Sequence, residues 1–442
     1  MTLTRWLQPA CLILLAASLR AEELTLEQAV QLALKQNRSI RNALLDVSKA
    51  NSKVAQVRTR LYPGLNLYVL GSQQLQSFDF TFNRGLLGVF PGIGPVPAED
   101  VKVSTPLQPT AIMIARLQQP LTTIRRIRLN IATLKLNTRI AEEQGRQQRL
   151  DVVRNVRKLY YGIQQFDSSL AAVRQTLALY KELDRMTSDY VKQQAALESD
   201  ALAVQTNLAK TEQTRITLED QQATAKEQLN QLLGRDVLSE FTVTSIGPAS
   251  EFEADIALAR KRALEMRPEV RQARLRVEAA QSDVRAKRSE YIPDISADFN
   301  HVTLVNFNQF IPSHFSSVGV SMSWEVWDWN RKKYELAEKR DVAEQAANGA
   351  RDAESLIVID VNDKFRQLRQ ARGQLNVAEL ARRTAAEGLR VAKDRYQVRA
   401  SLLKDVLEAQ AKLEQAAANS QQALAAYWTA KAEFERALGE DQ

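Results

Sequence analysis

The sequence is almost without cysteine and histidine. Its one cysteine, Cys11, lies in an N-terminal apolar stretch, and its two histidines are His301 and His314. Zinc sites take several such ligands, so no dedicated metal site is expected. The sequence also has no nucleophile elbow, no Gly-rich nucleotide loop and no Ser-His-Asp triad order. We therefore expect no bound cofactor and no catalytic activity.

Long apolar runs are absent after residue 21. Residues 1–21 have the pattern of a secretory signal peptide, with Arg5 ahead of an apolar run and small residues before a cut after Ala21. No later segment is long and apolar enough for a membrane helix. We therefore expect an exported chain without such a helix. The net charge of +8 is dispersed along the sequence, which favours solvated helix faces and no nucleic-acid partner.

Proline is missing between Leu121 and Gly234, and glycine is nearly so. Within this stretch apolar residues recur alternately four and three positions apart, at Val152, Val156, Leu159, Ile163, Phe166, Leu170, Val173, Leu177 and Tyr180. This heptad period predicts a helix that packs against other helices along its length. We expect it to run from near Ile124 to near Lys192, over roughly 100 Å.

The sequence contains an internal repeat. A shift of 230 residues pairs Ala29 with Ala259 and Pro63 with Pro293, and further along the chain the shift is 206. The first copy therefore has 24 extra residues between Pro63 and Leu121, which we expect to form a variable, Gly- and Pro-rich loop. The predicted segments are a signal peptide (1–21), a first repeat (22–236), an equatorial linker (237–253) and a second repeat (254–442), with β-hairpins at about 61–121 and 291–328, long helices at about 124–192 and 330–398, and return helices at about 198–234 and 402–438.

At Pro63 and Pro293, which correspond in the two copies, the periodicity changes from helical to alternating. Ile295, Ala297 and Phe299 alternate with polar residues, and the same pattern runs from Val318 to Val326. Alternation of this kind predicts strands with one apolar and one polar face. The polar face that we expect to line an aqueous lumen consists of Asp294, Ser296, Asp298, Ser321 and Glu325.

Four strands are about half of the roughly eight that the smallest barrel needs. In a bilayer a sheet persists only when it is closed, so several chains would have to share one barrel. Three chains would supply about twelve strands around a cyclic axis. The expected fold is thus mainly α with a small β part, a long coiled-coil helical barrel joined to a trimeric 12-stranded membrane β-barrel. A soluble sandwich and a solid coiled coil remain the alternatives.

The chain resembles the TolC-like outer-membrane efflux family. The resemblance is carried by the opening Leu24–Val30, by Pro63 and Pro293 at strand starts, by Gln119–Leu121 and by Tyr396 followed by Asp405–Ala409. It implies a homotrimeric channel in the outer-membrane lipid of a Gram-negative bacterium, extending into the periplasm. It further implies two protein partners, a periplasmic adaptor and an inner-membrane pump.

The resemblance also implies site residues. Asp405 and Glu408 match an acidic ring that narrows the periplasmic aperture, and Asp200 and Tyr396 match a bond that holds the tip closed. Ser401 stands where TolC has an arginine, so the resemblance does not predict which contacts hold the tip closed. The adaptor-contact turns match Gln194, Ala195, Leu197, Ser199, Arg399, Ser401 and Leu402.

Two functions follow as hypotheses. The first is a passive exit duct of a tripartite efflux or type I secretion system, opened at its periplasmic tip by the adaptor and pump. The second is a periplasmic coiled-coil adaptor or scaffold protein without a channel. A channel would need detergent for extraction and would conduct ions, whereas an adaptor would do neither.

Overall fold

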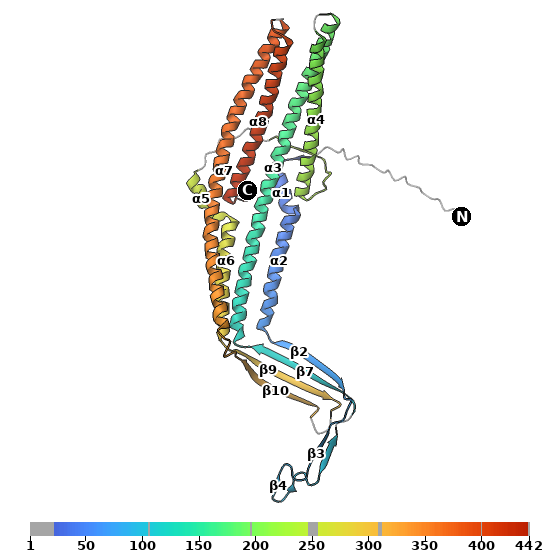
Figure 1. Ribbon diagram of the computed structural model, residues 1–442, viewed down its shortest axis with the longest axis vertical. Coiled ribbons are helices and arrows are strands. Elements are labelled where there is room, and N and C mark those ends of the chain that lie inside the picture. Colours follow the sequence, from blue (N-terminus) through green and yellow to red (C-terminus); the bar gives the residue numbers. More distant parts are fainter. Residues whose placement is uncertain are drawn as a thin grey trace, which may run out of the picture. The chain divides into compact units, whose positions relative to one another are not determined.

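The computed structural model describes residues 22–104, 107–194, 197–245, 255–307, 312–398 and 400–440. The predicted signal peptide, linker residues 246–253, Ala195 and Arg399 lie outside the described residues. The described chain is mainly helical, with a smaller β part (Figure 1). None of its helices combines the length and the apolar character that a membrane crossing requires.

The chain divides into two compact units, and each unit draws on both predicted repeats. The first lies within Met1–Leu44, Gln144–Val270 and Glu354–Gln442, and the second within Leu45–Glu143 and Arg271–Ala353. Four helices contribute residues to both units: α2 (Arg38–Arg58), α3 (Thr123–Lys192), α6 (Pro268–Arg288) and α7 (Arg331–Gln397).

The first unit is built from packed helices and one small sheet. Most of the heptad seam of α3 is buried as its period predicts, and Val156 and Ile163 are 0% exposed. Tyr160 is also fully buried, and its hydroxyl donates to the carbonyl of Leu24 at 2.8 Å. The remaining elements of this unit are β1 (Glu22–Leu24), α1 (Leu26–Gln36), α4 (Glu198–Leu233), β8 (Phe241–Val243), α5 (Ile256–Met266) and α8 (Leu403–Leu438), with β1 and β8 paired in parallel.

Local sequence signals begin and end these helices. Thr25 and Gln28 form a capping box at the start of α1, and the Asp255 side chain accepts from the Ala257 N–H at the start of α5. Gly234 and Gly439 end α4 and α8 in the left-handed conformation, with φ of 77° and 78°.

The second unit contains a four-stranded antiparallel sheet in the order β10-β9-β7-β2 (Figure 1). Its two hairpins meet at β7 and β9, so β2 and β10 are the edges. Two short 3-10 helices, Thr59–Leu61 and Ser289–Tyr291, precede β2 and β9. The strands are β2 (Gly64–Gln73), β7 (Pro109–Pro120), β9 (Asp294–Val305) and β10 (His314–Ser323).

The extra segment of the first hairpin has structure of its own. We expected a loop between β2 and β7, and the structure has two small hairpins there. They are formed by β3 (Asp79–Phe82) with β6 (Val101–Ser104), and by β4 (Val89–Phe90) with β5 (Gly94–Pro95). We call residues 77–104 the arm. Phe80 and Phe82 of the arm are 54% and 39% exposed.

Strand β10 ends earlier than the alternation predicts. Alternation continues to Val326, but the strand stops at Ser323, so Glu325 lies outside it. The reason is the partner strand, because Ser323 pairs with Asp294, the first residue of β9, and the chain before Asp294 is Pro293 and a 3-10 helix. Glu325 instead forms ion pairs with Arg331 at 2.5 Å and Lys332 at 3.3 Å at the start of α7.

Candidate functional site

The turns between the long and return helices of the first unit carry exposed apolar side chains. Leu197 and Leu402 are 69% and 70% exposed, each directly before α4 or α8 begins. Gln194 takes the left-handed conformation with φ of 54°, a backbone shape that usually selects glycine. Ser199 is exposed, and the Ser401 hydroxyl is buried without a hydrogen-bond partner.

Asp200 and Tyr396 lie within electrostatic range of each other. Burial raises the pKa of Tyr396, and the charges of Tyr190 and Asp200 raise it further. Within the described residues no hydrogen bond joins the Asp200 and Tyr396 side chains. Asp200 lies in the first turn of α4, where a carboxylate also stabilises the helix N-terminus.

Asp405 has a structural role that the sequence analysis did not consider. Its carboxylate accepts a hydrogen bond from the Leu402 N–H at 3.0 Å and so caps α8. The signal was present in the sequence, because an acidic residue three positions into a helix is a capping pattern. Glu408 lies one turn on and faces Lys404 at 3.7 Å, with both side chains more than half exposed.

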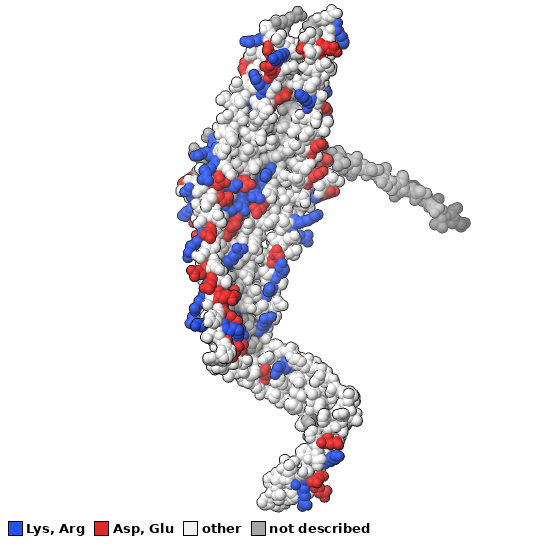
Figure 2. Space-filling view, viewed as in Figure 1, with Lys and Arg blue, Asp and Glu red and all other residues white. Residues whose placement is uncertain are grey.

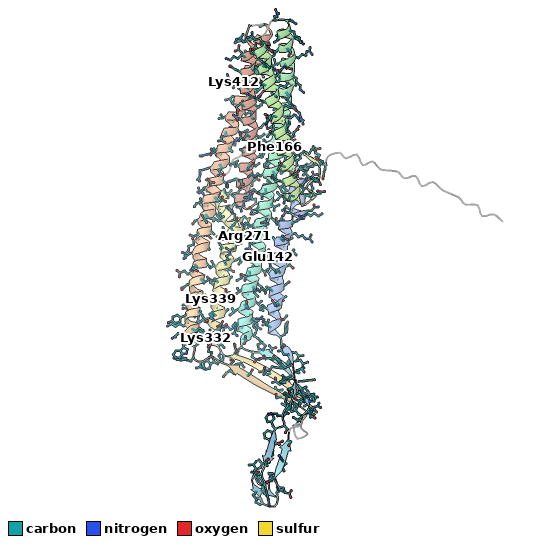
Figure 3. All side chains as sticks on the ribbon, turned by 45° about the vertical axis from the view of Figure 1, so that its right-hand side comes forward. Glu142, Phe166, Arg271, Lys332, Lys339 and Lys412 are labelled. Atoms are coloured by element: carbon teal, nitrogen blue, oxygen red, sulfur yellow. The ribbon has the colours of Figure 1, made fainter. Side chains whose placement is uncertain are left out.

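Asp405 and Glu408 both line an open groove of about 810 Å³ between α7 and α8. The groove is otherwise largely apolar, with Leu380 and Ala381 on α7 and Ala409 on α8. Lys412, labelled in Figure 3, lies further along α8 and is its one basic lining residue. The structure therefore places the two predicted aperture carboxylates on one surface of α8.

The sheet has a polar face that includes the predicted lumen residues of β9 and β10. Asp294 accepts from Arg126 at 3.0 Å and from Thr123 at 3.2 Å. The hydroxyls of Ser296 and Ser321 are 2.8 Å apart, and Ser321 also donates to Asp298. Four of the five predicted lumen residues thus lie on one face, and Glu325 lies past the strand end.

Strand β7 adds polar residues to this face that the sequence analysis did not single out. Gln118 donates to Ser296 at 2.9 Å, and Arg116 donates to Asn300 at 3.1 Å. Their register opposite Asp298 and Asn300 places them on the same face. Their signal is weak in sequence because the alternation in the first hairpin is less regular.

The opposite face of the sheet carries exposed apolar side chains on both edge strands. Each of four such side chains is more than half exposed: Leu67, Val69, Val318 and Val320. Figure 2 shows that the sheet has very few Lys, Arg, Asp or Glu residues on the visible side, in contrast to the helices. An exposed apolar sheet face of this extent indicates a surface that contacts lipid or protein.

No metal centre is formed by the residues that the structure describes. They contain no group of three or more His, Cys, Asp or Glu side chains arranged to hold an ion. His301 instead shares a hydrogen bond with Ser316 at 2.8 Å on the strands.

Comparison with known sequences decides the family. A sequence profile described as outer membrane efflux protein matches residues 29–235 and 259–440. The chain belongs to the outer membrane efflux protein family. The two matched segments lie within the two predicted repeats, 22–236 and 254–442.

Individual relatives agree with this assignment. The outer membrane protein OprJ of Pseudomonas aeruginosa is 29% identical over 277 residues, which cover 61% of this efflux-family chain and 53% of OprJ. The match therefore spans about half the length of that relative.

Solved structures share the fold of this efflux-family protein. The Campylobacter jejuni CmeC outer membrane channel aligns over 94% of this chain and 85% of its own, with 16% identity and a TM-score of 0.78. The Vibrio cholerae outer membrane protein VceC aligns over 94% and 96%, with 15% identity and a TM-score of 0.76. At these identities the similarity shows the fold alone.

Proposed function

We propose that three copies of the chain form a channel in the outer membrane of a Gram-negative bacterium. Each copy contributes its four-stranded sheet to a 12-stranded barrel and its helices to a periplasmic helical barrel. The channel is a passive exit duct for a tripartite efflux or type I secretion system. Its role is transport and not catalysis.

The observation that carries this proposal is the open sheet of the second unit. Its edge strands β2 and β10 each pair on one side only, and its apolar face is exposed. A four-stranded sheet is too small to close on itself. Pairing β10 of one copy with β2 of the next satisfies the free edges, places the apolar face toward lipid and turns the polar face inward.

The helix turns support a gate at the periplasmic end. In a trimer, Asp405 and Glu408 from each copy would form an acidic ring that attracts cations and repels anions. Asp200 and Tyr396 would hold neighbouring helices together in the closed state. The exposed Leu197 and Leu402 beside Gln194, Ser199 and Ser401 offer a contact surface for a periplasmic adaptor, which couples the duct to an inner-membrane pump.

The first experiment measures assembly and conductance. Protein extracted with detergent is cross-linked to determine its oligomeric state and then inserted into planar bilayers. We expect a trimer and discrete current steps. A monomer that is soluble without detergent and passes no current would instead support the adaptor alternative and end the channel proposal.

A matched pair of variants tests the orientation of the sheet. Val318 is 83% exposed on the apolar face, and its neighbour Ser317 is on the polar face. Lysine facing lipid costs up to about 2–4 kcal/mol near the bilayer midplane, whereas lysine in a lumen costs little. We expect Val318→Lys to reduce insertion and trimer yield and Ser317→Lys to preserve both. The reverse order would mean that the faces are assigned the wrong way round.

A further inference from the structure

The polar face of the sheet becomes apolar toward the turn between β9 and β10. The strand register aligns the side chains of this face in rows that cross all four strands. One row is polar and consists of Asn66, Arg116, Asn300 and Ser317. The next two rows are aromatic or aliphatic at every paired position, with Tyr68, Ile114, Val302 and Phe315 in the first and Leu70, Ile112 and Leu304 in the second. We call these seven residues the collar.

Polar contacts border the collar on both sides. On the side toward the start of β9, Arg116 Nε donates to Asn300 Oδ1 at 3.1 Å. On the side toward the end of β2, the hydroxyls of Ser72 and Thr110 are 3.0 Å apart. The collar is therefore a bounded apolar band on a face that is otherwise polar.

The side chains of the collar are not covered within the described chain. Tyr68, Leu70 and Phe315 are 55%, 64% and 48% exposed. Contact with lipid does not explain the band, because a membrane barrel turns its apolar side chains outward and its polar ones inward. On the opposite face at the same level, His301 lies 2.8 Å from Ser316 and 3.3 Å from Thr303. An exposed apolar band of this kind indicates a surface that contacts an apolar group.

A cation lies at one border of the collar. The Arg116 side chain is exposed, and no carboxylate of a described residue forms an ion pair with it. Asp298, in the adjacent row, accepts from Ser321 instead. A guanidinium of this kind has N–H groups left to donate to an anion, and such charge-assisted hydrogen bonds are strong.

We propose that the collar and Arg116 together bind anionic amphiphiles inside the barrel. The apolar chain of the solute lies along the collar, and its anionic head group accepts hydrogen bonds from Arg116. The inference rests on the proposed function, which turns this face toward the lumen. Cyclic symmetry places three such sites at one level of the duct.

Block of the bilayer current measures this binding. Conducting wild-type trimer is titrated with decanoate and with butanoate, which have the same head group and differ by six methylene groups. We expect decanoate to halve the current at a concentration roughly tenfold or more below that of butanoate, because the longer chain removes more apolar surface from water.

Two substitutions on one strand form a matched pair. Val302 belongs to the collar, whereas Val305 is on the opposite face of β9 and is 39% exposed. We expect Val302→Asn and Arg116→Gln each to raise the half-blocking concentration of decanoate roughly tenfold, through loss of apolar contact and of charged hydrogen bonds respectively. Val305→Asn should behave like wild type. Every variant is first checked for trimer and for its unblocked current.

The outcomes separate this site from the channel itself. If decanoate blocks a conducting wild-type trimer no better than butanoate does, the site is wrong while the channel stands. Equal decanoate block in wild type, Val302→Asn and Arg116→Gln would place the amphiphile elsewhere in the duct or in the lipid, and would overturn the site as well. If wild-type protein forms no conducting trimer, both proposals fall.

Discussion

At the scale of single residues, the first unit contains a network of ion pairs around the buried Arg267. This side chain is 4% exposed, and it pairs with Glu269 at 2.8 Å and Asp360 at 2.5 Å. Arg436 joins the network by contacting Glu269 at 3.0 Å and Asp151 at 3.1 Å. The network ties α3, α6, α7 and α8 together at the break between α5 and α6. Breaking a buried pair on one side only is costly, since it leaves the other charge unpaired.

The network predicts a pH-dependent stability. Burial alone would raise the pKa of Glu269, but hydrogen bonds and charge from Arg267, with the charge of Arg436, hold that pKa below its ordinary value of 4.5. A lowered folded-state pKa contributes stability above pH 4.5, which is lost as pH falls through the folded value. We expect Glu269→Gln to cost about 2 kcal/mol at pH 7 and progressively less below about pH 4.5.

Thermal denaturation in detergent across pH measures this effect. Glu387→Gln is the control, because Glu387 pairs with Arg390 where both side chains are 62% exposed, so solvent screens the pair and the transition should change little at any pH. If the difference in denaturation temperature between wild type and Glu269→Gln stays constant down to pH 3, the predicted pH dependence is wrong.

Asp405 has two separable roles, as a cap and as a charge. Asp405→Asn keeps an oxygen that can accept from the Leu402 N–H, whereas Asp405→Ala removes it and should cost about 1 kcal/mol. If the acidic ring exists, both variants, each combined with Glu408→Ala, weaken cation block of the bilayer current to a similar degree. Only the alanine variant should lower the denaturation temperature further. Unchanged cation block in both would remove the ring assignment.

At the scale of elements, the heptad pattern predicted α3 closely because the period is a local property of the sequence. The helix runs over Thr123–Lys192, against an expectation of about 124–192. The predicted end of β10 was wrong by three residues, because alternation within one strand does not show where its partner β9 begins. The arm was expected as a loop, since its short hairpins have no alternation long enough to read.

The polar contacts of the candidate sites were the least predictable part. Arg267 and Asp360 are 93 positions apart, and Gln118 and Ser296 are 178 apart. Only the folded chain brings such pairs together. The cap by Asp405 is different, because it spans three residues and was readable from the sequence.

The surroundings of Gly234 predict that replacing it with alanine strongly destabilises the fold. It ends α4 with φ of 77°, and a Cβ there would lie 2.4 Å from the Gln36 carbonyl oxygen of α1. Gly439 ends α8 with φ of 78°, but its Cβ would lie 3.2 Å from the nearest backbone atom. The left-handed conformation alone costs alanine about 1–2 kcal/mol. We expect Gly234→Ala to lower the denaturation temperature clearly more than Gly439→Ala. Equal losses would mean that backbone conformation, and not the contact with α1, sets the cost.

At the scale of the whole molecule, the two repeats contain equivalent hairpins, of which only the first has the arm. The second hairpin closes between Val305 and His314, whereas the first carries the arm between Gln73 and Pro109. The register of β2 with β7 runs from Gly64 opposite Gln118 to Gln73 opposite Pro109 and does not involve the arm. We therefore expect the arm to be dispensable for strand pairing.

Deletion of the arm tests this separation. Residues 77–104 are replaced by a short Gly-Ser turn, and cross-linking and bilayer current are measured. We expect trimer yield within about twofold of wild type, because loop length changes closure entropy only slowly. Complete loss of the trimer would show that the arm takes part in assembly. Loss of current with an intact trimer would assign the arm a part in conduction.

The two free edges of the sheet also matter before assembly. A newly exported chain presents β2 and β10 with unsatisfied backbone groups and no charged side chain along either strand. Uncharged edge strands of this kind favour non-specific pairing with strands of other chains, and so aggregation. We therefore expect the unassembled chain to need protection before insertion. Either a chaperone covers both edge strands, or the subunits assemble faster than they associate with other unfolded chains.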